Sequence, residues 1–134
     1  MNGTLVYEDY LSLYNNNKIK SLSFKKSQIQ PSSIDLSLSE ECYEIKTSFL
    51  SPDNKVRDKL KQIYAKKISL KKSKIFKKNK TYIVKLNETL NLSNSLSGHC
   101  NPKSSTGRLN IFCRTILDFC DEYEKIPKNY NGEM

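Results

Sequence analysis

The sequence lacks several features that would each have assigned the protein to a class at once. No run approaches the ~20 consecutive apolar residues that cross a bilayer. The start, residues 1–14, carries Glu8 and Asp9 and has no basic segment of the kind that opens a secretory signal. The phosphate-binding pattern Gly-x-x-x-x-Gly-Lys-Ser/Thr does not occur. These absences predict a soluble, cytoplasmic protein without a membrane partner.

Paired cysteines are lacking, and the spacing of those present argues against metal binding. No Cys-x-x-Cys pair is present; the four cysteines are Cys42, Cys100, Cys113 and Cys120. A zinc deaminase needs His-x-Glu together with Pro-Cys-x-x-Cys, whereas the single histidine, His99, is followed by Cys100 and Asn101. The pattern predicts free, mostly buried thiols and no zinc.

Positive charge is concentrated in one segment. Residues 54–80 hold twelve Lys or Arg and one acid, a net charge of +11, which leaves −2 for the rest of a chain whose total is +9. Such a segment is either a nucleic-acid patch or a solvated lysine-rich surface. The solvated surface is favoured, because only Tyr64 and Phe76 are aromatic there and stacked bases need more. No nucleic-acid partner is therefore expected.

Apolar periodicity predicts more strands than helices. Helical spacing occurs over residues 5–14 and over 56–64. Short alternating or β-prone runs, typical of strands, occur at 33–39, 42–45, 68–70, 82–86, 90–92 and 111–117. Turn residues separate these runs, as at 51–54. The chain is long enough for one domain, and the balance favours a small β-sandwich or barrel with one or two helices.

The stretch that is most informative about chemistry is Asn101-Pro102-Lys103-Ser104-Ser105-Thr106-Gly107-Arg108. Its lysine supplies a point charge and its arginine a planar fork for phosphate oxygens. The hydroxyls and exposed backbone N–H groups add donors, and Gly107 permits a close backbone approach or a positive φ. A triphosphate needs this combination, although the same residues also form an ordinary turn.

The stretch 101–108 resembles the triphosphate motif of dCTP deaminases and their dUTPase relatives. Residues 28–38 resemble the early strand of that family, with its Gln-Pro-x-Ser-Ile/Leu-Asp-Leu-x-Leu pattern. Residues 81–90 resemble the strand before the phosphate motif, and 126–132 the Gly-Tyr/Trp-x-Gly turn before the catalytic strand. The resemblance implies a distorted β-barrel of jelly-roll character. It is closest to the first half of the longer deaminase type, which has two such domains in tandem.

The resemblance also implies roles for individual residues. The substrate triphosphate, usually with Mg²⁺ and without zinc, would be held by Lys103, Ser104, Ser105 and Arg108. Lys103 stands where many relatives have arginine. Structural hydrogen bonds at a domain contact are expected of Gln30, Asp35 and Asn101. Where many relatives have a sugar-binding aspartate this chain has Pro127, so the candidates for that role are Asp118 and Asp121.

The implied reaction is the hydrolytic deamination of dCTP to dUTP and ammonia. It would take place in a homotrimer, or a tandem-domain equivalent, with active sites between neighbouring domains. The catalytic glutamate is expected beyond Met134, because Glu133 is too early in the pattern. Residues 1–134 are thus expected to be one domain, incomplete at its C-terminus, with little activity alone. Two alternatives remain: a dUTPase-type hydrolase, and a non-catalytic module that binds nucleotides, or nucleic acid through residues 54–80.

Overall fold

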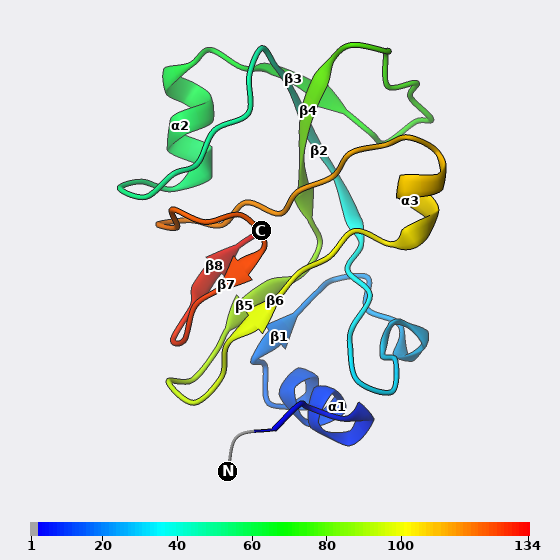
Figure 1. Ribbon diagram of the computed structural model, residues 1–134, viewed down its shortest axis with the longest axis vertical. Coiled ribbons are helices and arrows are strands. Elements are labelled where there is room, and N and C mark those ends of the chain that lie inside the picture. Colours follow the sequence, from blue (N-terminus) through cyan, green and yellow to red (C-terminus); the bar gives the residue numbers. More distant parts are fainter. Residues whose placement is uncertain (1–2) are drawn as a thin grey trace.

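The computed structural model describes residues 3–134 and consists mainly of antiparallel strands with short helices outside them (Figure 1). One sheet has the order β3-β2-β4, and a second has the order β1-β5-β8. Strands β6 and β7 form a separate pair. The bounds are β1 Ile19–Lys20, β2 Leu38–Ile45, β3 Lys66–Ser69, β4 Thr81–Leu86, β5 Thr89–Asn91, β6 Gly98–His99, β7 Lys125–Ile126 and β8 Asn131–Glu133. The mainly β prediction is confirmed, although among the described residues the sheets stay open and do not close into a barrel.

Both predicted helices are present, and two shorter ones join them. They are α1 (Tyr7–Asn15), the 3-10 helix η1 (Lys26–Gln28), α2 (Val56–Gln62) and α3 (Ser104–Arg108). Helix α1 stops where Asn17 adopts a φ of 56°, which asparagine tolerates better than most residues. Helix α2 ends earlier than its spacing predicted. Tyr64 has a φ of 48° and is 94% exposed, so it does not lie on the buried face with Leu60.

The strand predicted at 33–39 is wrong in its bounds. Strand β2 begins only at Leu38 and includes the run 42–45, so two predicted strands are one. Residues 28–37 fold back on themselves instead. The Asp35 N–H donates to the Gln28 carbonyl at 2.8 Å, and Ile34 makes only an isolated bridge with Ile29. Hydrogen bonds inside this segment therefore replace the ladder that alternation alone predicted.

The strand predicted at 111–117 is absent from the structure. Ile111 is 51% exposed and Phe112 is 83% exposed, while only Leu117 is fully buried. The segment lies between β6 and β7, which pair with each other, so it forms part of their long connection. The Ile111 N–H donates back to the Thr106 carbonyl at 2.9 Å rather than to a neighbouring strand. An apolar run becomes a strand only when an edge is available to pair with it.

The main core lies between the β1-β5-β8 sheet and the segment that follows the apolar run. Its buried members are Ile19, Leu90, Leu117, Cys120, Tyr130 and Met134. Tyr10 and Leu13 of α1 pack against it.

All four cysteines are free, but the prediction of mostly buried thiols is wrong for Cys113, which is exposed. No helix among residues 3–134 is long and apolar enough to span a bilayer.

A network of ion pairs links the two larger sheets. The Arg57 guanidinium of α2 donates to both oxygens of Glu41 on β2, at 2.7 and 3.2 Å, and to Glu133 on β8 at 3.0 Å. Lys85 of β4 approaches the other Glu133 oxygen at 2.8 Å. The hydrogen bond from Arg57 is the largest cause that lowers the pKa of Glu41, to about 2.

We expect Glu41→Gln to lower the free energy of unfolding by about 1–2 kcal/mol at pH 7, between the values typical of surface and buried pairs. Because folding lowers the Glu41 pKa, its contribution is present above the unfolded pKa of roughly 4.3 and disappears as the pH falls toward 2. Urea unfolding of the wild type and of Glu41→Gln at pH 7 and at pH 2.5 measures the difference in their unfolding free energies, which should be smaller at pH 2.5. Glu40→Gln is the matched control, since that carboxylate is 64% exposed and 3.9 Å from Lys71. Equal effects of the two substitutions would contradict the prediction.

Candidate functional site

The stretch 101–108 forms a single exposed turn of helix. Lys103 is the residue before α3, and its carbonyl accepts hydrogen bonds from the Thr106 N–H at 3.0 Å and the Thr106 hydroxyl at 2.6 Å. Ser104 and Arg108 lie four residues apart and thus on one side of the helix. Ser104, Ser105 and Arg108 are all exposed. The structure therefore places Ser104 and Arg108 on one side of an exposed turn, with Ser105 exposed in the same turn and Lys103 directly before it.

Gly107 does not adopt a positive φ, so of its two predicted roles only the close backbone approach stays a prediction. No glycine among the described residues has a positive φ. No atom lies within 4 Å of the position that a Gly107 Cβ would take, so the space beside this residue is open. A ligand can approach the backbone of α3 there without meeting a side chain.

Lys103 is held by the folded segment 28–37. Its Nζ donates to Oδ2 of Asp35 at 2.6 Å. The Gln30 amide donates to the same oxygen at 3.4 Å and to the Ser27 carbonyl at 3.2 Å. Asn101 is exposed, two residues ahead of Lys103. Two of the three polar residues singled out in the sequence thus converge on the phosphate motif.

The candidate sugar-binding acids lie elsewhere. Asp118 is only 7% exposed, and its Oδ1 accepts a hydrogen bond from the N–H of Val56, the first residue of α2, at 2.7 Å. Figure 1 shows α2 and α3 on opposite sides of the long strands β2 and β4. Asp121 is exposed. The structure therefore does not group these aspartates with Lys103, and their sugar-binding role stays a prediction.

The turn 126–132 needs its glycine for close packing. Tyr130 is buried, and its hydroxyl accepts from the Asp118 N–H at 3.2 Å and donates to the Glu133 carbonyl. A Cβ on Gly132 would lie 2.7 Å from that hydroxyl and 3.3 Å from Oδ2 of Asp118. Residues that interlock in this way leave no room for a side chain, which is the physical reason for glycine at this place in the motif.

Sequence reasoning missed Glu88. This side chain is completely buried and accepts hydrogen bonds from Gln28 and Ser37. No signal in the sequence marked it, because a charged residue in a turn between two strands is common. Only its burial is unusual, since a buried charged group needs a partner or hydrogen bonds.

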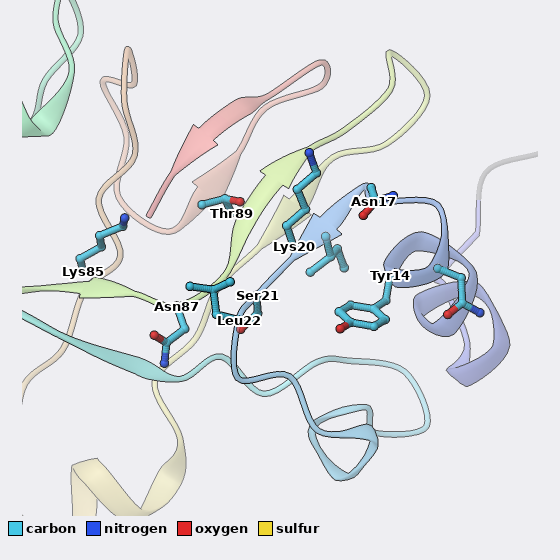
Figure 2. Close-up of a pocket in the computed structure, with 10 residues that line it drawn as sticks. Tyr14, Asn17, Lys20, Ser21, Leu22, Lys85, Asn87 and Thr89 are labelled. Atoms are coloured by element: carbon cyan, nitrogen blue, oxygen red, sulfur yellow. The ribbon is translucent and has the colours of Figure 1, made fainter.

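Neither of two open cavities contains the phosphate motif. One, of about 570 Å³, is lined by α1, β1 and the ends of β4 and β5, with Tyr14, Lys20, Lys85 and Asn87 among its residues (Figure 2). The other, of about 430 Å³, is lined by Tyr43, Arg57, Leu60, Lys61, Tyr64, Ala65 and Lys67. The residues 103–108 instead face open solvent, so a second surface is needed to enclose a ligand there.

The family comparison agrees with this geometry. Residues 1–134 match the family described as 2'-deoxycytidine 5'-triphosphate deaminase (DCD) N-terminal domain. The chain belongs to this family. The resemblance seen in the motifs is thus confirmed for the dCTP deaminase N-terminal region.

A solved structure extends the match to three dimensions. The 2'-deoxycytidine 5'-triphosphate deaminase from Agrobacterium tumefaciens superposes on this DCD N-terminal domain with a TM-score of 0.93 and 37% identity. The match covers 98% of this chain and 40% of that one, so the chain spans less than half the length of its relative. No curated protein matches the sequence.

Within this DCD N-terminal domain, Glu133 of β8 is bonded to two cations. Its carboxylate meets Arg57 of α2 at 3.0 Å and Lys85 of β4 at 2.8 Å, and so joins three elements. Partial burial would raise the pKa of Glu133, but hydrogen bonds from Lys85 and Arg57 outweigh that effect and the pKa lies below its ordinary value. A general base near neutral pH works best with a pKa close to the operating pH, so this environment is consistent with the prediction that the catalytic glutamate is another residue.

Proposed function

We propose that this domain takes part in the hydrolytic deamination of dCTP. In that reaction water adds to C4 of cytosine and ammonia leaves, which gives dUTP. The observation that carries the proposal is the exposed cluster of Lys103, Ser104, Ser105 and Arg108 in a chain of the dCTP deaminase family.

Each motif residue has a chemical task in this proposal. The Arg108 guanidinium binds phosphate oxygens through its planar fork. The hydroxyls of Ser104 and Ser105 donate to the same group, and the open space beside Gly107 admits it. An ammonium has three N–H donors, so Lys103 can contact a phosphate while it keeps its bond to Asp35. The motif therefore binds the triphosphate through charge and directed hydrogen bonds together.

Mg²⁺ fits this site as a companion of the substrate. It prefers oxygen ligands and usually combines phosphate oxygens and waters with one or two protein ligands. The motif offers hydroxyl oxygens, and its nearest carboxylate, Asp35, is already bonded to Lys103. We therefore place most of the Mg²⁺ ligands on the triphosphate itself, where the ion lowers the negative charge that Lys103 and Arg108 must meet. Zinc has no part in the proposal.

A neighbouring domain completes the site in this proposal. Leu109, Ile111 and Phe112 follow Arg108 directly and are 71%, 51% and 83% exposed. An exposed apolar cluster of this kind is typical of an interface. A homotrimer or a tandem domain would cover these residues and enclose the substrate, and it is there, rather than at Glu133, that we place the acid–base group.

The products of the reaction test the proposal. We expect the assembled protein, in which a neighbouring domain supplies the acid–base group, to release ammonia and dUTP from dCTP and Mg²⁺ in equal amounts, measured by an ammonia assay and nucleotide chromatography. Residues 1–134 alone should bind dCTP–Mg²⁺ but show little turnover. Pyrophosphate and dUMP formed from dUTP would instead indicate a dUTPase. Nucleotide binding that falls steeply with salt and shows no preference for dCTP would indicate a general polyanion module that uses the lysines of 54–80. Either result would overturn the proposal.

A further inference from the structure

Glu88 is a buried carboxyl group that the proposed chemistry does not use. It lies between β4 and β5 and is 0% exposed. Its Oε1 accepts hydrogen bonds from the Gln28 amide at 2.9 Å and the Ser37 hydroxyl at 2.8 Å, and its Oε2 accepts from the Ser37 N–H at 2.9 Å. All three donors are neutral. A buried acid is costly, and a well-packed apolar residue often stabilises such a place as well or better. Stability alone therefore does not account for a glutamate here.

The bonds of Glu88 hold both ends of the segment 28–37. Gln28 at one end donates its amide to Glu88 and also to the Asp35 carbonyl, the latter at 2.8 Å. Ser37 at the other end contributes both its hydroxyl and its N–H. The Asp35 N–H returns to the Gln28 carbonyl at 2.8 Å. Hydrogen bonds inside the segment give it its fold, and one buried side chain from a distant part of the sequence fastens both of its ends.

The same segment presents Asp35 to Lys103. The Lys103 Nζ lies 2.6 Å from Oδ2 of Asp35, and Lys103 directly precedes the phosphate-binding turn α3. A free lysine side chain has about 2 kcal/mol of rotamer entropy to lose when it binds a ligand. A lysine already held in place loses less of it, and the ligand binds more tightly for that reason.

We infer that Glu88 is a positioning residue for the triphosphate motif. It acts through the segment 28–37, which keeps Asp35 where it orients the Lys103 ammonium. The inference rests on the proposed function for the part that concerns triphosphate binding. The orientation of Lys103 itself does not depend on that function.

The test is a double-mutant cycle between Glu88 and Lys103. Glu88→Gln keeps the size of the side chain but replaces one carboxylate oxygen by an NH₂ group. That group faces a hydrogen-bond donor, Gln28 or Ser37, and cannot accept its bond. We expect it to weaken dCTP–Mg²⁺ binding by about 3- to 10-fold, the effect of releasing one long side chain. In a Lys103→Ala background the same substitution should leave binding unchanged while still lowering the unfolding midpoint. Losses that multiply in the double variant would overturn the inference, because a general loss of structure would act without Lys103.

A second measurement needs no nucleotide. Lys103 is 67% exposed and open to amine acylation, which peptide mass spectrometry can follow, with the exposed Lys78 in the same sample as reference. Glu88→Gln should speed acylation of Lys103 and not of Lys78. Ser37→Ala, which removes one donor to Glu88 and leaves the bonds of Gln28 to Glu88 and to Asp35 in place, should do the same if Glu88→Gln does not fold. An unchanged rate in a folded variant would overturn the inference. If Lys103→Ala left dCTP binding unchanged, the proposed function would fail, and the acylation rates alone would decide the positioning role.

Discussion

Arg108→Ala is expected to weaken dCTP–Mg²⁺ binding by roughly 10- to 100-fold. Hydrogen bonds to a charged group are worth about 1.5–3 kcal/mol, and the guanidinium fork makes two of them at once. Arg108 is exposed and its side chain makes no hydrogen bond or ion pair within residues 3–134, so its truncation breaks no such bond of the free protein. The unfolding midpoint should therefore remain the same. Titration calorimetry at constant ionic strength measures the affinity.

Lys78→Ala is the charge-matched control for Arg108→Ala. Lys78 is also exposed, and it lies in the connection between β3 and β4, outside residues 101–108. Removing it changes the net charge by the same amount but should alter affinity by less than about 2-fold, because exposed charges are screened within ~10 Å at moderate salt. The loss of affinity in Arg108→Lys should lie between those of Arg108→Ala and Lys78→Ala, since lysine keeps the charge but lacks the planar guanidinium fork. Equal losses for Arg108→Ala and Lys78→Ala would contradict a specific triphosphate site.

Leu117→Ala is expected to lower the free energy of unfolding by about 3–4 kcal/mol. Leu117 is 0% exposed and lies in the core cluster with Ile19, Leu90 and Tyr130. Truncating a leucine there removes apolar burial and leaves a cavity, and such changes typically cost about 2–5 kcal/mol. Urea unfolding followed by tyrosine fluorescence measures the effect, which should appear as a lower midpoint with an unchanged slope.

Leu109→Ala provides the same chemical change eight positions earlier. That leucine is 71% exposed, so its loss should change the unfolding free energy by less than about 0.5 kcal/mol. The pair tests the finding that the apolar run 111–117 and its flank are exposed except at the end. A large effect at Leu109 in the isolated chain would mean that this segment is buried, contrary to the structure. Should a neighbouring domain cover it, the effect would appear only in the assembled protein.

Much of the architecture was predictable because local patterns happen to agree with it. Alternation at Tyr82, Val84 and Leu86 predicted β4, and the helical spacing at 5–14 predicted α1. Prediction was wrong where a segment's partner lies far away in sequence. Ser37 shows this well, because its N–H bonds to Glu88 rather than to a strand, and β2 begins one residue later. Periodicity cannot show which backbone groups a distant side chain will occupy.

In the candidate site, too, local residue types were predictable from the sequence, whereas contacts between distant residues were not. The residue types at 101–108 alone indicated phosphate binding, since lysine, arginine and hydroxyls are what a phosphate needs whatever fold carries them. The partnership of Lys103 with Asp35 joins residues 68 positions apart. Asp118 was a candidate ligand by its residue type, yet in the folded chain its carboxylate binds the first N–H of α2.

The sequence by itself thus determined the family and the mainly β character, because these depend on residue identity and short spacing, and on the same basis it predicted phosphate binding at 101–108. Only the tertiary structure decided that Glu88 is buried, that the segment 28–37 curls around it, and that the apolar run after Arg108 stays exposed. Those outcomes depend on which hydrogen-bond donors and apolar surfaces come into contact once the chain has folded. Such contacts join residues far apart in sequence, so local spacing does not encode them.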